Sequence, residues 1–91
     1  MSHTVHEKQK LINRVRRLRG QAEGLERMLE EEKGCGEVMH AIAGMRGAIS
    51  GLMGEVIEDH IRMHLAAENL TQAERDEGAA ELIDVLRTYL K

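Results

Sequence analysis

Two long stretches of this chain carry apolar residues at alternating spacings of four and three positions. Such spacing is typical of a helix with one continuous apolar seam, as in coiled coils and helical bundles. The two seams consist of Leu11, Val15, Leu18, Ala22, Leu25 and Leu29, and of Val38, Ile42, Met45, Ile49, Leu52 and Val56. Because the chain contains no proline, nothing interrupts either stretch, and the sequence predicts an all-α fold.

Glycines and a capping motif predict the helix boundaries. Gly34-Cys35-Gly36 predicts a break, because glycine adopts the positive φ that ends many helices. Thr71 with Glu74 three residues later predicts the start of a third helix. We therefore expect one domain, residues 1–91, with helices over about residues 5–32 and 37–67 and a third that ends near Tyr89, with Leu82, Leu86 and Tyr89 on one face.

The supply of large side chains predicts self-association. The 91 residues include one Tyr, six Met and neither Phe nor Trp. So short a chain buries little apolar surface by itself, and Met specifies a rigid core poorly. We expect an obligate homo-oligomer in which a second copy completes the core.

Three features predict a cytoplasmic protein without a membrane segment. No apolar run approaches the roughly 20 residues that span a bilayer. The first residues lack the apolar stretch of a signal peptide. The single cysteine fits a reducing compartment.

Charge is unevenly distributed along the chain, whose net charge is −3. Residues 7–19 carry six cations and one acid, whereas residues 23–37 carry six acids and two cations. A charge run is usually a solvated face, but this basic run lacks the alternation of a self-paired helix. The shortage of aromatics argues against stacking on single strands. The sequence therefore predicts phosphate contacts with duplex DNA by Lys10, Arg14, Arg16, Arg17 and Arg19.

Four glycines interrupt the second helix. Each costs about 1 kcal/mol relative to alanine in a helix interior, and together they line one stripe roughly opposite the apolar seam: Gly44, Gly47, Gly51 and Gly54. We interpret the stripe as a place of close helix packing, with a DNA backbone as the secondary interpretation.

A Cys/His constellation predicts a metal site. On a helix, His60 and His64 project from one face and can share an ion, although surface histidines often show this spacing. Cys35 projects within about 20° of that direction but lies about 37 Å away along the helix. Two antiparallel copies related by a twofold axis near Gly47 would bring Cys35 of one chain beside His60 of the other.

The same hairpin places the N-terminus near this site. With a turn near residue 34, His3 falls within reach of His64, which predicts a composite site of His3, His60 and His64 from one chain and Cys35 from the other. These ligands suit Ni(II), Co(II) or Zn(II) better than Cu(I), and an added N-terminal amine would favour nickel or cobalt. His6 is a weaker candidate ligand, and we interpret His40 as a surface histidine. No arrangement typical of an enzyme is visible.

These motifs resemble the CsoR/RcnR/FrmR family of repressors, which sense copper, nickel/cobalt or formaldehyde. The resemblance covers nearly the whole chain and rests on residues 14–21 (RVRRLRGQ), Cys35, residues 42–48 (IAGMRGA), residues 51–56 (GLMGEV) followed by His60, and the C-terminal LRTYLK. It implies antiparallel four-helix dimers that assemble into a flat tetramer. It also implies repression by the apo protein, with release on ligand binding and derepression of a metal-efflux gene.

Within this family, His3, Cys35, His60 and His64 resemble the nickel/cobalt-sensing pattern. Copper sensors carry a second Cys where this chain has His64, and sulfur-responsive members need two cysteines. Formaldehyde sensors share the Cys but typically have Pro after the initiator Met, where this chain has Ser2, and they lack His at position 64. Formaldehyde sensing, with Cys35 as nucleophile, is the alternative. The alternative of another class is a cytosolic metal-buffering protein without specific DNA binding, which would explain Cys35 and the histidines but would give the basic segment no role.

Overall fold

The structure is a computed structural model that describes the backbone of residues 5–91 and the side chains of residues 7–91. It contains α1 (Val5–Glu30), α2 (Cys35–His64) and α3 (Gln72–Tyr89), and the described residues include no strand. The predicted all-α class with three helices is confirmed. None of the helices in the described part is long and apolar enough to cross a membrane.

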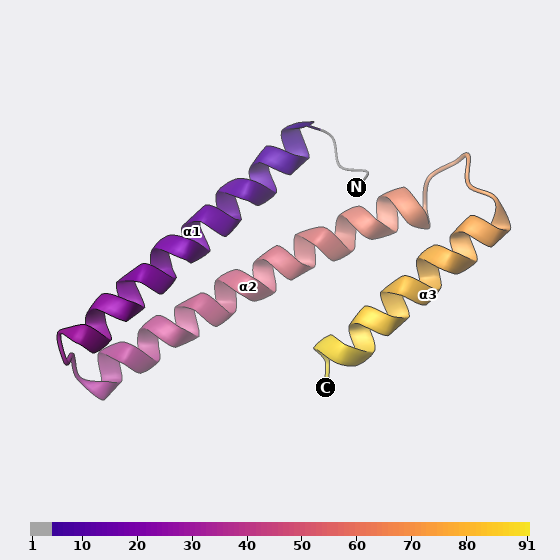
Figure 1. Cartoon of the computed structure of the whole chain (residues 1–91). Coiled ribbons are helices and arrows are strands. Elements are labelled where there is room, and N and C mark those ends of the chain that lie inside the picture. Colours follow the sequence, from indigo (N-terminus) through magenta and orange to yellow (C-terminus); the bar gives the residue numbers. More distant parts are fainter. Residues whose placement is uncertain (1–4) are drawn as a thin grey trace. The chain divides into compact units, whose positions relative to one another are not determined.

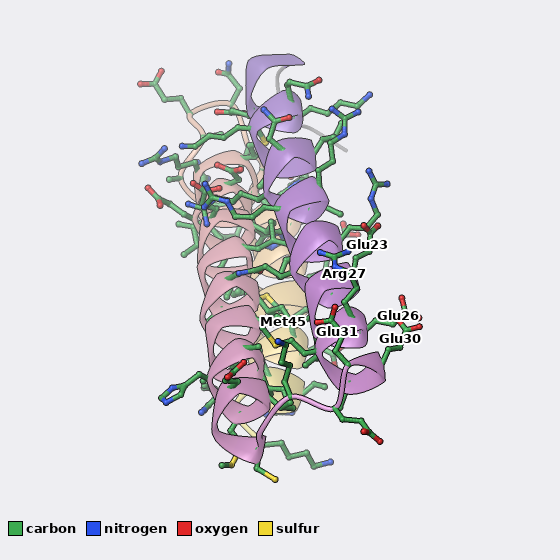
Figure 2. The ribbon with its side chains drawn as sticks, turned by 90° about the vertical axis from the view of Figure 1, so that its left-hand side faces the viewer. Glu23, Glu26, Arg27, Glu30, Glu31 and Met45 are labelled. Atoms are coloured by element: carbon green, nitrogen blue, oxygen red, sulfur yellow. The ribbon has the colours of Figure 1, made fainter. Side chains whose placement is uncertain are left out.

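The chain divides after Met53 into two units, one built on α1 and the first part of α2, the other on residues 54–91. In the first unit α1 and α2 run antiparallel, side by side, as a helical hairpin (Figure 1). Met45 lies on the side of α2 that faces α1 (Figure 2). The acidic Glu23, Glu26 and Glu30 project from α1 into solvent.

The turn between α1 and α2 differs from the sequence prediction. The residue with positive φ is Glu32, at 56°, and no glycine in the described part has one. The amide of Lys33 donates to the Met28 carbonyl at 2.9 Å, and the amide of Glu32 donates to the Leu29 carbonyl at 3.2 Å. This pair of bonds is a Schellman motif with Glu32 where glycine usually stands. The helix therefore ends at Glu30, before the glycines, and α2 begins at Cys35 instead of residue 37.

Glu32→Gly is expected to stabilise the protein by about 0.5–1 kcal/mol. The left-handed conformation costs a residue with a Cβ about 1–2 kcal/mol, which exceeds the entropy that glycine loses on folding. Chemical denaturation measures the difference. As a control, Glu30→Gly, at the last residue of α1, should destabilise the protein. Equal destabilisation by both substitutions would contradict the assigned role of Glu32.

Each predicted seam divides into two faces. In α1 the alternate members Leu11, Leu18 and Leu25 are half-buried, whereas Val15, Ala22 and Leu29 are exposed. In α2 the half-buried members are Val38, Met45 and Leu52, and the exposed ones are Ile42, Ile49 and Val56. No hydrophobic side chain among the described residues is fully buried. The single chain therefore leaves half of each apolar seam in contact with solvent.

The second unit contains the last turns of α2, a connecting loop and α3. Helix α2 ends at His64, three residues before the predicted end. The predicted capping box at the start of α3 is confirmed: the Glu74 amide donates to the Thr71 hydroxyl at 3.1 Å, and the Thr71 amide donates to the Glu74 carboxylate at 2.9 Å. The hydrogen bond that the carboxylate accepts from the Thr71 backbone amide, followed by the one from the Thr71 side chain, lowers the pKa of Glu74.

Candidate metal centre and nucleic-acid interface

His60 and His64 lie together on the last turn of α2. Their ring centroids are 4.8 Å apart, with the ring planes tilted by 37°. Both side chains are half-buried. The predicted sharing of one helix face is therefore confirmed for this pair, and two imidazoles so close together can bind the same ion.

A carbonyl of α3 orients the ring of His60. The Nε2 atom of His60 lies 2.8 Å from the backbone oxygen of Gly78. Because a carbonyl oxygen only accepts hydrogen bonds, Nε2 must carry the proton, and the neutral ring then presents Nδ1 as its lone pair. A hydrogen bond of this kind fixes the tautomer of a metal-binding histidine and raises its basicity as a ligand.

This hydrogen bond depends on very close packing of α3 against the end of α2. Gly78 is the one fully buried residue of α3. A Cβ at this position would lie 2.5 Å from the His64 carbonyl oxygen and 2.9 Å from its Cβ. Only glycine allows the two backbones to approach so closely. Sequence reasoning missed Gly78, and its signal was a single glycine within a helix rich in strong helix formers.

The surroundings of His64 on this unit are acidic. A cavity of about 190 Å³ is lined by His64, Leu70, Glu74, Glu77, Gly78 and Glu81. The lowered pKa of Glu74 keeps that carboxylate ionised. Three glutamates beside an imidazole make this end of α2 more favourable for a cation than for an anion.

Cys35 lies at the other end of α2, where it is an exposed free thiol on the first residue of the helix. His3 falls outside the described residues. Among those that are described, no three His, Cys, Asp or Glu residues come together as a metal site. Within the part of the chain that the structure describes, one copy therefore supplies a histidine pair, and the composite site with His3 and a second chain's Cys35 stays a prediction.

The predicted DNA-contacting cations do not share one environment. Lys10, Arg16, Arg17 and Arg19 are exposed on α1. Arg14 is half-buried, and its Nη1 atom lies 3.0 Å from where a Cβ on Gly51 would stand. Arg14 thus extends across α2 at a point where glycine makes room for it, whereas the other four cations project from α1.

The glycine stripe does not serve intrachain helix packing as a whole. Gly44, Gly47 and Gly54 have open space where a side chain would project. Only Gly51 meets a neighbour, the guanidinium of Arg14. The expectation of close helix packing along the stripe is therefore not met within one chain.

Comparison with known proteins places the chain in a family. The family model described as "Metal-sensitive transcriptional repressor" matches residues 7–88. An uncharacterized protein encoded in the bioA 5′ region of Serratia marcescens is 50% identical over the whole of both chains. The transcriptional repressor RcnR of Salmonella paratyphi B is 41% identical, again over the whole of both chains.

Two solved structures share the fold. A Glu-to-His variant of the formaldehyde-responsive regulator FrmR from Salmonella enterica serovar Typhimurium matches with a TM-score of 0.89 and 41% identity, over 96% of this chain and 98% of that one. The copper-sensing repressor CsoR from Geobacillus thermodenitrificans, solved with Cu(I), matches with a TM-score of 0.90 and 22% identity, over 100% of this chain and 94% of that one. The family consists of transcriptional repressors, not enzymes. This chain belongs to the metal-sensitive transcriptional repressors, the CsoR/RcnR/FrmR family.

Proposed function

We propose that this protein represses transcription by binding operator DNA in its metal-free form, and that Ni(II) or Co(II) releases it and derepresses a metal-efflux gene. The observation that carries the proposal is the pair of adjacent imidazoles of His60 and His64 at the end of α2. Imidazole nitrogens are ligands that nickel, cobalt and zinc all accept. The full ligand set would be His3, His60 and His64 of one chain and Cys35 of another.

The exposed apolar stripe of α2 supports the dimer that this site requires. Ile42, Ile49 and Val56 follow each other at intervals of seven residues, and Cys35 precedes them at the same interval. Two such stripes pack antiparallel about a twofold axis when the central member, Ile49, meets its own copy. In that register Cys35 lies opposite about position 63, between the two histidines of the second chain. The dimer would bury the stripe and complete two equivalent sites.

The exposed faces of α1 extend the same argument. Val15, Ala22 and Leu29 also stand seven residues apart, and Leu29 is 60% exposed. A helical hairpin with one apolar face packed internally and another exposed is half of a four-helix bundle. We therefore propose an antiparallel four-helix dimer as the DNA-binding unit, with assembly of dimers into a tetramer.

Metal and DNA would oppose each other through the N-terminal segment. That segment carries His3 and leads directly into the cations of α1. Binding His3 to the same ion as His60 would fix the start of α1 and shift Lys10 and Arg17 relative to the DNA phosphates. By linkage, an ion that favours this arrangement weakens DNA binding by the same factor by which DNA weakens metal binding.

The test is fluorescence anisotropy of the reduced protein on its own promoter, titrated anaerobically with Ni(II), Co(II), Zn(II), Cu(I) and formaldehyde. Release by nickel or cobalt supports the proposal. Release by formaldehyde alone would support the second candidate, in which the exposed thiol of Cys35 is the nucleophile. That candidate is favoured by the likeness to a formaldehyde-responsive regulator.

Arg17→Ala is expected to weaken operator binding and to reduce the slope of log affinity against log salt by about one for each phosphate that the side chain neutralises. Arg17 is exposed on the basic part of α1. Anisotropy titrations at several salt concentrations measure both quantities. Arg27→Ala is the matched control, because Arg27 is an exposed cation of the same helix that lies among glutamates (Figure 2). An unchanged slope for Arg17→Ala would remove this residue from the DNA interface.

A further inference from the structure

Each of the three nitrogens of the Arg75 guanidinium on α3 donates a hydrogen bond to a backbone carbonyl of the loop that follows α2. Its Nε donates to Leu65 at 3.2 Å, its Nη1 to Leu70 at 3.0 Å and its Nη2 to Ala67 at 3.0 Å. All three bonds are partly buried. Carbonyls at a helix end and in the loop beyond it have no helical partner, so Arg75 satisfies acceptors that would otherwise need water.

The same loop is held at its other end by the capping box of α3. Thr71 and Glu74 exchange their reciprocal hydrogen bonds there, and the Arg75 amide donates to the Thr71 carbonyl at 3.0 Å. The seven residues between His64 and α3 are therefore fixed by contacts from α3 itself. Arginine meets the three carbonyls from three separate nitrogens of a planar fork, whereas the donors of lysine all lie on one nitrogen.

The path of this loop determines where Gly78 lies. Gly78 is three residues after Arg75, so both lie on the same face of α3. On that face Gly78 contacts the backbone of His64 and accepts the hydrogen bond of His60 Nε2. A loop that loosens would let α3 move away from α2, and the ring of His60 would lose its carbonyl.

We propose that Arg75 is a positioning residue for the histidine pair: by clamping the α2–α3 loop it keeps the Gly78 carbonyl on His60 Nε2. The orientation of His60 is then built into the protein before any ion binds. The consequence for metal affinity rests on the proposed function, but the consequence for the His60 ring does not.

The experiment compares Arg75→Lys with the full-length wild-type protein in the metal-free state by ¹⁵N–¹H NMR of the imidazoles. In the wild type, His60 should be the Nε2-protonated tautomer, with an Nε2 proton in slow exchange with water. In Arg75→Lys the exchange of that proton should accelerate at least about fivefold, because the single nitrogen of lysine cannot keep all three hydrogen bonds that arginine makes from separate nitrogens. Arg87→Lys, at an exposed position in the last turn of α3, is the control and should leave the exchange unchanged.

If Arg75→Lys does not fold, the Arg75 Nε proton of the wild type is followed instead: slow exchange supports the clamp, and exchange as fast as that of Arg87 overturns it. Unchanged His60 exchange in a folded Arg75→Lys protein also overturns it.

Cobalt titration separates this inference from the proposed function. If Co(II) binds at the histidines, Arg75→Lys should weaken it by about 10-fold or more, as loss of outer-shell support does, and shift its ligand-field absorption. Unaltered affinity and spectrum would overturn the positioning role. A wild type whose His60 is oriented but binds no cobalt would contradict the proposed function and leave the clamp supported.

Discussion

Replacing His64 with leucine is expected to abolish the release of operator DNA by Ni(II) and Co(II). The substitution removes one of two imidazoles whose centroids lie 4.8 Å apart. Loss of an outer-shell partner alone costs a metal site about 10- to 100-fold in affinity, so the loss of a ligand should exceed about 100-fold. Position 64 is half-buried beside Gly78, and leucine fills a similar space there, so the substitution should disturb the packing little.

The measurement is a pair of titrations on the metal-free protein. Isothermal calorimetry or Co(II) absorption gives the metal affinity, and anisotropy on the promoter gives the release. His40→Leu is the matched control, because His40 is an exposed histidine of the same helix and is not in the proposed ligand set. His64→Leu should still bind DNA with wild-type affinity when no metal is present. Release by nickel or cobalt at wild-type concentrations in His64→Leu would sink the ligand assignment.

The sequence predicted those features that depend only on residues close together along the chain. The capping box of Thr71 and Glu74 forms as its spacing indicates, because both partners lie within one turn of helix. The shared face of His60 and His64 follows from helical periodicity alone. The helix ends were less predictable: Glu32 adopts the left-handed conformation that the neighbouring glycines were expected to take.

Features that depend on distant residues were not predictable from spacing. Helix α2 stops at His64, and the carbonyl of the next residue, Leu65, meets Arg75 ten residues further along the sequence. The hydrogen bond between His60 and Gly78 joins residues 18 positions apart and uses a backbone oxygen, so no side-chain motif in the sequence indicates it. Arg14 lies over Gly51 on a neighbouring helix, a contact that its spacing from Arg17 did not indicate, and its place on the DNA face stays a prediction. The apolar spacing also did not separate the residues of each seam that are half-buried within the chain from those that stay exposed.

Ile49→Asp is expected to dissociate the proposed dimer and, with it, to remove operator binding. Ile49 is 48% exposed in the single chain and lies at the centre of the stripe between Ile42 and Val56. In a twofold antiparallel dimer this position meets its own copy, so the substitution places two carboxylates together in an apolar interface. Burying charges without partners costs several kcal/mol, which weakens association by roughly 100-fold or more.

Analytical ultracentrifugation across a dilution series measures this effect. The wild type should stay associated at every dilution, whereas Ile49→Asp should sediment as a monomer. If exposure of its core unfolds the monomer, its helical content should fall as well. Ile49→Leu keeps the volume and apolar character of the side chain, so this control should associate as the wild type does. An Ile49→Asp protein that remains dimeric would mean that the α2 stripe is not the interface. Cys35 could then not reach the histidines of a second chain in this register. The composite metal site therefore requires the proposed dimer.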